Sequence, residues 1–414
     1  SEDIDYLRKK NLFNEGFLEY LKKFKFTGDI YAVKEGSVVF PNEPIVTVKA
    51  PVIEAQLIET MLLLTINHQS LIATKANRIV RAAKDRTVLE FGARRAQGYD
   101  AAILGARAAY IGGVHGSATA LSDIEFNVPA SGTMAHSFIQ LYNDEYEAFS
   151  AYAKHNPDNT TLLVDTYNVL ESGIPNAIRV AKEVLEPMGK RLKGVRLDSG
   201  DLTYLSNKSR KMLDEAGLED CKIVASNSLD EKIISELLNQ KAPIDIFGVG
   251  ERLITSKSQP VFGGVYKLCA VEENGELVPR IKISENVEKV TNPGYKTLYR
   301  FYDKDSKKAI GDVIALHDEI INKDEYEIFD PIHTWKRKIL KNFEVRKMQI
   351  PIFIKGECVY ESPSIQEIRE YCESEVESLW DEVKRFVNPQ EYYVDLSQKL
   401  YDLKQSLLKN HSFR

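Results

Sequence analysis

The sequence has few cysteines and lacks a long apolar run. No apolar segment reaches the about 18–20 residues needed to span a bilayer, and no apolar signal-peptide segment opens the sequence. The cysteines are scattered without a CxxC pair, which favours reduced thiols over a disulfide framework or a zinc site. We therefore expect a cytoplasmic protein with no membrane partner. The four cysteines are Cys221, Cys269, Cys358 and Cys372.

An excess of positive charge is also absent. The chain has 61 Asp and Glu against 55 Lys and Arg, which gives a formal net charge of −6. This balance argues against a nucleic acid as partner. The 43% hydrophobic and 28% charged content is typical of a globular protein, and the length of 414 residues predicts two domains.

The first 75 residues predict the start of one domain. Alternating apolar residues between turn signals predict three strands, at residues 26–30, 37–40 and 45–48. From Pro51 to about Lys84 the apolar residues recur at helical spacing, which predicts one long helix or a broken pair.

The segment 76–264 has a different pattern, in which short apolar strands alternate with helices. Helical spacing is clear at residues 174–190, 203–216 and 230–239. Strands that recur every ~20–30 residues with helices between them predict a parallel sheet. The fold class is therefore α/β, with an irregular seven-stranded α/β barrel. The seven predicted strands lie at residues 88–91, 109–111, 126–128, 161–164, 195–197, 222–225 and 244–247.

Strand-like sequence returns after residue 264. Residues 265–271 and 277–283 predict strands on either side of a turn at Asn274-Gly275, so we expect residues 265–365 to rejoin the domain begun by the first 75 residues. Residues 366–414 predict a C-terminal helical segment, amphipathic and rich in Glu and Lys.

Polar and glycine residues follow nearly every predicted strand of the segment 76–264. Because the carboxyl ends of parallel strands meet at one face, these residues are expected to converge on one site. Any one of these residues alone is a weak signal, and their convergence is what favours a functional site. They are Arg94, Arg95, His115, Ser117, Thr133, His136, Asp165, Arg196, Asp198, Ser199, Gly200, Ser226, Asn227, Gly248 and Gly250.

Two groups of these residues suit a phosphorylated ligand. Gly248 and Gly250 would let the backbone approach a phosphate closely, although a lone GxG is often only a loop. Arg94 and Arg95 offer two guanidinium groups to oxyanions, or else form surface salt bridges.

A second group suits a carboxylate and a sugar. Arg196 can hold a planar carboxylate through two hydrogen bonds. Asp198 and Asp201 flank a tight turn that can bind a ribose diol or hold Mg²⁺, but Asp201 is better explained as a helix N-cap. Phe91 would stack on an aromatic ring, unless it belongs to the core. The whole set predicts a site for an Mg²⁺-bound phosphorylated sugar and an aromatic acid.

His136 lies at a predicted strand-to-helix junction, between an apolar segment and a helical pattern. A lone histidine is more often a packed or surface residue than a catalyst. The chemistry-bearing residues at the other junctions favour the catalytic interpretation here.

Six ordered motifs give the chain a resemblance that runs from its first helix to its C-terminus. They are EFGARRAQG (90–98), YIGGVHGSATA (110–120), ASGTMAHS (130–137), GVRLDSGDL (194–202), VASNSLDE (224–231) and GVGERLITS (248–256). On these motifs the chain resembles the nicotinate phosphoribosyltransferase family of type II phosphoribosyltransferases. The resemblance implies a barrel joined to a sandwich-like domain built from both chain ends, and a homodimer.

The resemblance also implies a reaction of NAD salvage. Nicotinate and 5-phosphoribosyl diphosphate give nicotinate mononucleotide and diphosphate, coupled to ATP hydrolysis with Mg²⁺ bound to the phosphate groups. We expect no metal site formed by the protein alone.

Residue roles follow from the resemblance position by position. His136 matches the histidine that ATP phosphorylates, and Asp165 matches a carboxylate beside it. Asp198 matches the ribose-binding aspartate. Nicotinate contacts are expected from Phe91, Thr133 and Arg196. Phosphoribosyl and phosphate contacts are expected from Arg94, Arg95, Ser199, Gly200, Ser226, Asn227, Gly248, Gly250 and Glu251.

The chain departs from the family pattern at several positions. Ala118 stands where the nicotinamide-using relative has an aspartate, which favours the acid over the amide. Glu251 stands where threonine is frequent, and His115 and Ser117 stand where Asp and Thr are expected. The family's tyrosine-bearing first segment would precede this chain.

Two alternatives stay open from the sequence. One is a homologue that binds nucleotides without turnover. The other is a quinolinate phosphoribosyltransferase, which would require more cationic residues and no phosphorylated histidine.

Overall fold

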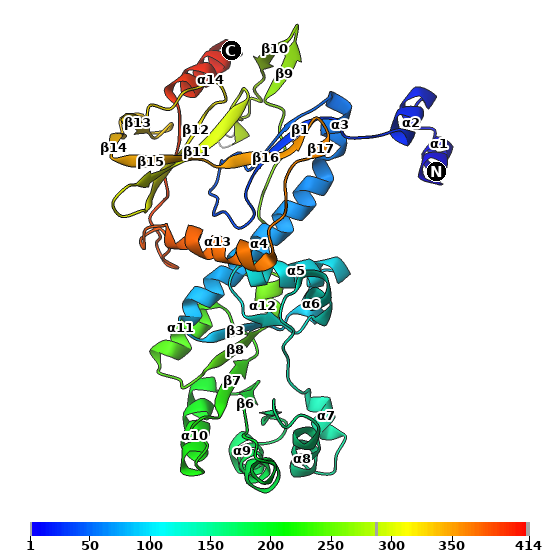
Figure 1. The fold of residues 1–414 in the computed structure, drawn as a ribbon, viewed down its shortest axis with the longest axis vertical. Helices are drawn as coiled ribbons and strands as arrows, with labels where there is room; N and C mark the ends of the chain where they lie inside the picture. The colour runs from blue at the N-terminus through cyan, green and yellow to red at the C-terminus, as the bar shows by residue number, and fades with distance from the viewer. Residues whose placement is uncertain (1, 286–288, 411–414) are drawn as a thin grey trace. The chain divides into compact units, whose positions relative to one another are not determined.

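The computed structural model describes residues 2–285 and 289–410, and the chain forms two compact units. Figure 1 follows the chain through them. Unit 1 comprises Ser1–Leu63, Val265–Pro363 and Ser374–Arg414, and unit 2 comprises Leu64–Gly264 and Ser364–Glu373.

Unit 2 is built on a six-stranded sheet of order β4-β3-β8-β7-β6-β5, in which every strand pair is parallel. The central strands β7 and β8 are apolar and buried along nearly their whole length. This pattern is typical of a parallel sheet covered on both faces. The strands are β3 (Thr87–Glu90), β4 (Gly116–Ser117), β5 (Thr161–Leu163), β6 (Gly194–Leu197), β7 (Lys222–Ser226) and β8 (Ile246–Val249).

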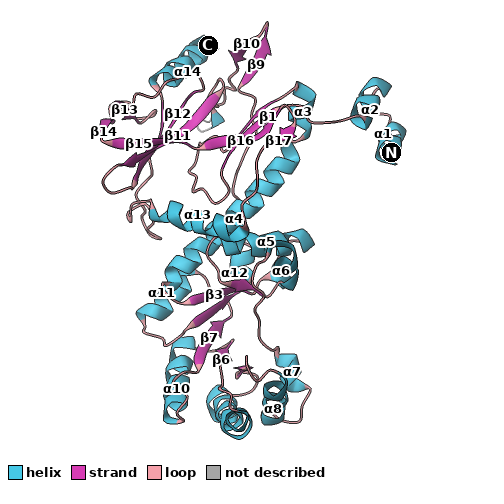
Figure 2. Ribbon diagram, viewed as in Figure 1, coloured by secondary structure: helices cyan, strands magenta, loops and turns pink. Residues whose placement is uncertain are grey.

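Helices connect these strands, and Figure 2 shows α10 beside β7. The helices predicted at 203–216 and 230–239 are confirmed as α10 and α11. Each begins at an aspartate N-cap, because Asp201 accepts a hydrogen bond from Tyr204 N–H and Asp230 accepts one from Ile233 N–H. The main helices are α5 (Tyr99–Ile111), α6 (Ala120–Phe126), α7 (His136–Gln140), α8 (Glu145–His155), α9 (Ile174–Val180), α10 (Leu202–Glu215), α11 (Glu231–Asn239) and α12 (Glu251–Ile254).

Two of the seven predicted strands are wrong. Residues 109–111 form the last turn of α5, where consecutive apolar residues are all buried, and a short apolar run does not distinguish a strand from a buried helix end. Residues 126–128 contain the end of α6, which Asn127 caps in the left-handed conformation with φ 59°. The short strand β4 was not predicted. Among the described residues no ladder joins β4 to β5, so the seven-stranded barrel is not confirmed.

Unit 1 contains two four-stranded sheets, of order β17-β16-β1-β2 and β15-β11-β12-β18, and two hairpins. Val33 of β1 packs against a buried cluster that contains Leu298, Ile314 and Leu396. The strands are β1 (Asp29–Val33), β2 (Val46–Lys49), β9 (Ala270–Glu273), β10 (Glu276–Pro279), β11 (Lys296–Asp303), β12 (Ala309–Leu316), β13 (Glu325–Phe329), β14 (Arg337–Lys341), β15 (Phe343–Lys347), β16 (Gln349–Ile354), β17 (Glu357–Cys358) and β18 (Val394–Leu396).

The predictions for the chain ends hold in part. The strand predicted at 45–48 corresponds to β2, the one predicted at 26–30 overlaps β1 at residues 29 and 30 only, and residues 37–40 form no strand. The predicted broken helix pair after Pro51 is confirmed as α3 (Val52–Leu57) and α4 (Glu59–Ala83). The predicted turn at Asn274-Gly275 joins β9 to β10, although these strands cover only part of residues 265–271 and 277–283.

The C-terminal segment is not purely helical. It contains α13 (Ile365–Glu377), then β18, then α14 (Gln398–Asn410). Strand β18 pairs in parallel with β12, with Asp312 opposite Val394. A three-residue strand whose partner is so distant in sequence has no local periodicity that could reveal it.

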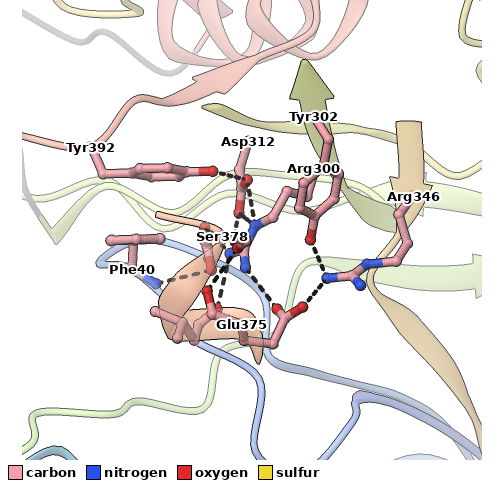
Figure 3. Close-up of polar contacts among 10 residues, drawn as sticks. Phe40, Arg300, Tyr302, Asp312, Arg346, Glu375, Ser378 and Tyr392 are labelled. Atoms are coloured by element: carbon pink, nitrogen blue, oxygen red, sulfur yellow. Dashed lines mark hydrogen bonds and ion pairs between the residues drawn. The ribbon is translucent and has the colours of Figure 1, made fainter. Parts of the chain in front are cut away.

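A buried charged cluster in unit 1 surrounds Arg300 (Figure 3). The guanidinium forms a two-pronged pair with Asp312 on the neighbouring strand, with Nε–Oδ1 at 2.9 Å and Nη2–Oδ2 at 2.7 Å. Its Nη1 donates to Glu375 Oε2 at 3.1 Å, and the Tyr392 hydroxyl donates to Asp312 Oδ1 at 2.7 Å. Arg300 and Asp312 have fully buried side chains. Buried charges are tolerated when they are paired and hydrogen-bonded in this way.

Glu43 is a third carboxyl group beside this cluster. Its side chain is fully buried, 4.0 Å from Arg300 Nη2, and its Oε2 accepts a hydrogen bond from Phe40 N–H at 3.0 Å. Burial, together with the neighbouring Asp312, raises the pKa of Glu43 to about 10. Glu43 is therefore neutral at pH 7, and its proton can be donated toward Asp312.

Glu43→Gln should flatten the dependence of stability on pH. The folded pKa is raised, so the stabilisation from Glu43 is full below about pH 4.5 and is lost as pH rises toward 10. This loss is at most about 1.4 kcal/mol per pH unit. Glutamine is neutral throughout, so between pH 6 and 7 the variant should lose less unfolding free energy than the wild type. Urea titrations at both pH values test this, with exposed Glu344→Gln as control; equal slopes for wild type and Glu43→Gln would contradict it.

Candidate functional site

The candidate site of unit 2 lies at the carboxyl ends of its parallel strands. Phe91 follows β3, Asp198 follows β6, and Gly250 follows β8, while Ser226 ends β7. Asp165 lies two positions after the end of β5. The strand-end residues thus come to one edge of the sheet, as the sequence predicted.

Arg196 forms side-chain hydrogen bonds with three other residues at this edge of the sheet. Its Nη1 donates to Thr133 Oγ1 at 2.8 Å, its Nε donates to Ser226 Oγ at 2.8 Å, and its Nη2 donates to Asp198 Oδ1 at 2.9 Å. The guanidinium carbon lies 5.5 Å from the centroid of the Phe91 ring. Two of the five guanidinium N–H groups are not engaged by any described residue. A fixed guanidinium beside an aromatic ring suits a flat, negatively charged ring compound.

Asp198 is held as a carboxylate. Its Oδ1 also accepts a hydrogen bond from Ser226 Oγ. Burial alone would raise the pKa of Asp198, but the hydrogen bond from Ser226 and the positive charge of Arg196 outweigh it and lower the pKa. The other oxygen, Oδ2, lies 3.6 Å from His136 Nε2. An ionised carboxylate in this position can accept hydrogen bonds from hydroxyl groups.

His136 begins helix α7, and its side chain is 40% exposed. Its Nδ1 lies 3.1 Å from Thr166 Oγ1, at hydrogen-bond distance. Its Nε2 faces two carboxylates, Asp198 and Asp165, the latter with Oδ1 at 3.8 Å. The ring is therefore fixed through Nδ1, while Nε2 points to the carboxylates. Thr166, which was not singled out from the sequence, is the residue that orients the ring through Nδ1.

Asp165 is almost completely buried, with a side chain 2% exposed. Its Oδ2 accepts hydrogen bonds from Asp198 N–H at 3.1 Å and from Ser199 Oγ at 2.5 Å. Its Oδ1 has no hydrogen-bond partner among the described residues. A buried carboxylate oxygen without a partner is expected to receive one from a ligand, a water or an ion.

The glycines at the end of β8, Gly248 within the strand and Gly250 directly after it, permit close packing. A Cβ atom on Gly248 would lie 2.6 Å from the ring of Phe91, and one on Gly250 would lie 3.2 Å from the carbonyl oxygen of Phe91. Side chains at these positions would displace the aromatic ring from the edge of the sheet. The GxG segment therefore positions Phe91 and also leaves the adjacent backbone open.

Glu251 follows this segment, and its carboxylate is paired with Lys257 Nζ at 2.7 Å. The hydrogen bond from Lys257 and its charge, with a smaller contribution from Arg95, lower the pKa of Glu251. This ion pair neutralises the negative charge of Glu251, which stands where threonine is frequent in the family. An open hollow of about 350 Å³ is lined here by Arg95, Gln97, Glu251, Thr255, Lys257 and Pro260.

The remaining predicted residues lie in the loops of the same edge. Arg94 and Arg95 are exposed in a single helical turn after Gly92. Gly200 and Asn227 both adopt positive φ, at 79° and 80°. In Gly200 this fits the tight turn that places Asp201 at the start of α10.

Three contributing residues were missed by the motif reading of strand ends: Glu90, Thr166 and Lys257. Glu90 looks like the end of an apolar strand, and Thr166 and Lys257 act only through contacts with His136 and Glu251. Glu90 opens the motif at 90–98 and Lys257 follows the motif at 248–256, whereas Thr166 is marked only by its place next to Asp165.

Within residues 2–285 and 289–410, no group of three or more His, Cys, Asp or Glu side chains is arranged to hold a metal ion. In the same part of the chain no helix combines the length and apolar character that a membrane crossing requires.

A parallel sheet with a fixed guanidinium, two carboxylates, a histidine and a GxG turn at its carboxyl edge is typical of an α/β enzyme that binds a phosphorylated substrate. Comparison with known proteins identifies the particular class. Family models match residues 1–67 (nicotinate phosphoribosyltransferase N-terminal domain), 87–318 (nicotinate phosphoribosyltransferase family) and 295–404 (C-terminal domain). The chain belongs to the nicotinate phosphoribosyltransferase family.

Relatives agree over most of the chain. Nicotinate phosphoribosyltransferase of Bacillus subtilis is 50% identical over 97% of this chain and 82% of its own length. The Dictyostelium discoideum enzyme of the same name is 37% identical over 93% and 74%. The crystal structure of human nicotinic acid phosphoribosyltransferase superimposes with a TM-score of 0.85 at 27% identity, covering 98% of this chain and 88% of the human chain.

Proposed function

We propose that this chain transfers the phosphoribosyl group of 5-phosphoribosyl diphosphate to nicotinate, forming nicotinate mononucleotide and diphosphate in NAD salvage. Family membership supports the reaction. The assignment of nicotinate as the substrate rests on Arg196, whose guanidinium is held by three hydrogen bonds beside the ring of Phe91. It can bind the carboxylate of nicotinate, while Phe91 stacks on the pyridine ring.

The other side chains of the site would bind the ribose and the phosphate groups of 5-phosphoribosyl diphosphate. Asp198 would accept hydrogen bonds from the ribose hydroxyls, with Ser199 and Ser226 beside it. The backbone after β8, with Arg94, Arg95 and Asn227, would hold the phosphate groups. Loss of diphosphate from the ribose carbon produces positive charge on the ring. The nearby carboxylates can stabilise this charge, so the protein acts mainly by positioning and charge compensation.

We also propose that ATP phosphorylates His136 and that this step drives the transfer. His136 is partly exposed, and Thr166 fixes its ring so that Nε2 faces Asp165 and Asp198. A neutral imidazole is a competent nucleophile near pH 7. We also propose the barrel-like active site and the cytoplasmic location that the sequence predicts.

Mg²⁺ would accompany the phosphate groups of both substrates. The unpartnered Oδ1 of Asp165 and the partly exposed Asp198 are the oxygen donors that this cation prefers. They fit one or two ligands, with phosphate oxygens and water as the others. When bound, the cation would neutralise charge on the diphosphate leaving group.

Arg196→Lys tests the assignment of the substrate carboxylate. Lysine keeps the charge but loses the planar pair of donors, so kcat/KM for nicotinate should fall by roughly 10- to 150-fold. Wild type should strongly prefer nicotinate to nicotinamide, because Ala118 offers no acceptor to an amide. Surface Arg191→Lys serves as the control. Equal efficiency of the wild type on both substrates would contradict the assignment, and no turnover at all would favour a nucleotide-binding homologue.

We further propose a homodimer, supported by an apolar surface on unit 1. Helix α3 exposes Val52, Ile53 and Leu57, and the strand-poor segment after residue 264 exposes Val265 and Leu268. Contiguous exposed apolar side chains of this kind are typical of protein interfaces.

Leu57→Glu should weaken this association. A charged side chain in an apolar interface carries a desolvation cost, so the dimer dissociation constant should rise by at least about tenfold. Sedimentation velocity over a concentration series measures this, with exposed Lys211→Glu on α10 as control. A wild type that sediments as a monomer throughout would exclude the dimer.

A further inference from the structure

Glu90, the last residue of β3, is a buried carboxyl group directly beneath the candidate site. The residue is 0% exposed. One carboxyl oxygen, Oε1, accepts a hydrogen bond from Gly92 N–H, and Oε2 lies 2.6 Å from Ser117 Oγ at hydrogen-bond distance. Ser117 Oγ in turn accepts a hydrogen bond from Thr119 N–H at 2.9 Å. The side chain therefore connects two loops of the sheet edge, one after β3 and one after β4.

The backbone of Glu90 strengthens the same connection. Its carbonyl oxygen accepts a hydrogen bond from Ala118 N–H at 2.9 Å. Gly92 has no room for a side chain, since a Cβ atom there would lie 2.7 Å from Glu90 Oε1 and 2.6 Å from Ile254. The Gly92 turn is thus pressed against the carboxyl group from one side and against α12 from the other.

The two connected loops carry two residues expected at the nicotinate pocket, Phe91 to stack on the ring and Ala118 to favour the acid over the amide. Phe91 lies between Glu90 and Gly92, and its ring lies close to Gly248 and 5.5 Å from the Arg196 guanidinium. Ala118 lies between Ser117 and Thr119 and is exposed. Neither Phe91 nor Ala118 has a polar side chain, so each is positioned by its own backbone hydrogen bond, to Val249 O and to Glu90 O, and by the hydrogen bonds of its neighbours.

Burial raises the pKa of Glu90, against the opposing effect of the hydrogen bonds from Ser117 and Gly92. Both carboxyl oxygens of Glu90 act as acceptors, Oε1 from Gly92 N–H and Oε2 from Ser117 Oγ. Glutamine can keep both contacts, because its amide oxygen accepts from Gly92 N–H and its NH2 group donates to Ser117 Oγ.

We propose that Glu90 is a positioning residue for the nicotinate pocket, which holds Phe91 and Ala118 in register and thereby sets the preference for the acid over the amide. This inference rests on the proposed function. It goes further, because it assigns the selectivity to a residue that touches neither substrate.

Three variants test it: Glu90→Gln, Glu90→Ala and Ser117→Ala. Glu90→Ala leaves Gly92 N–H and Ser117 without their buried partner, so KM for nicotinate should rise about tenfold, with KM for 5-phosphoribosyl diphosphate nearly unchanged. The preference for nicotinate over nicotinamide should fall with it. Glu90→Gln should keep KM for nicotinate within about twofold of wild type, because both hydrogen bonds are retained. Ser117→Ala, which cuts only one link, should lie between them.

Ser206→Ala is the matched control, since this buried hydroxyl on α10 bonds only to its own helix at Thr203 O. It should lower the melting temperature like Ser117→Ala and leave both KM values and the acid preference unchanged.

Three outcomes would overturn the proposal. These are an unchanged KM for nicotinate in folded Glu90→Ala, an equal rise in KM for both substrates, or damage from Glu90→Gln equal to that from Glu90→Ala. If Glu90→Ala does not fold, the nicotinate KM of Ser117→Ala decides alone. A wild type that forms no nicotinate mononucleotide would refute the proposed function instead. Calorimetric titration of nicotinate into the same variants would then show directly whether Glu90 shapes the pocket.

Discussion

His136→Ala should abolish ATP hydrolysis and the incorporation of acid-labile phosphate from ATP, while slow transfer without ATP persists. The proposed nucleophile is the imidazole of His136, which can act in its neutral form near pH 7. The carboxylates that face Nε2, Asp165 and Asp198, remain in the variant and can still stabilise the developing positive charge on ribose. The measurement is ATP consumed per nicotinate mononucleotide formed.

His155→Ala is the control for this experiment. His155 is an exposed histidine at the end of α8, in the same unit, and its loss should leave the coupling unchanged. If His136→Ala still hydrolyses ATP in step with product, the phosphorylated residue lies elsewhere in the chain.

Arg300→Met should be the most destabilising single substitution discussed here, by about 3–5 kcal/mol of unfolding free energy. It removes the cation paired with the buried carboxylate of Asp312, whereas Glu375 keeps its ion pair with Arg346. Removal of one partner of a buried ion pair exposes the full desolvation cost of the charges that remain. Urea denaturation at pH 7 measures the loss.

Two further variants separate burial of charge from loss of a side chain. Arg337→Met removes an arginine of a partly exposed pair with Glu327 and should cost less than about 1 kcal/mol. Adding Asp312→Leu to Arg300→Met should recover part of the loss, because it removes an unpaired buried carboxylate. A midpoint for Arg300→Met close to that of Arg337→Met would show that the cluster contributes little.

Local patterns predicted much of the fold. The helices α10 and α11 follow from apolar periodicity, and Asp201 is the N-cap that the sequence predicts for α10. The wrong strand predictions occurred where the spacing of apolar residues does not distinguish a strand from a helix or reveal a distant partner. A buried helix end at 109–111 has the same composition as a strand, and β18 exists only through its pairing with β12.

The residues of the candidate site were likewise predictable from local sequence in some cases and not in others. Arg196 and Asp198 were predictable because parallel strands bring their ends together, whatever the details of the sheet. Thr166 and Glu90 were not predictable, because each acts through a contact with a residue distant in the sequence. Thr166 contacts His136, 30 positions away, and Glu90 contacts Ser117, 27 positions away. Arg300 was missed because an arginine in a strand is usually exposed, and its burial depends on carboxylates from other segments.

The division of unit 1 among three stretches of chain affects how the protein is made. Strand β1 pairs with β2 almost as soon as both leave the ribosome, but its other edge must wait for β16. The hydrogen bond from Lys355 N–H to Asp29 spans 326 residues, which at about 5–20 residues per second is a delay of roughly 15–65 s. Nearly all of unit 2 emerges during that interval and can fold. An open strand edge on a nascent chain is a site for chaperone binding or misassembly, so the N-terminal segment is the part of the newborn chain most in need of protection.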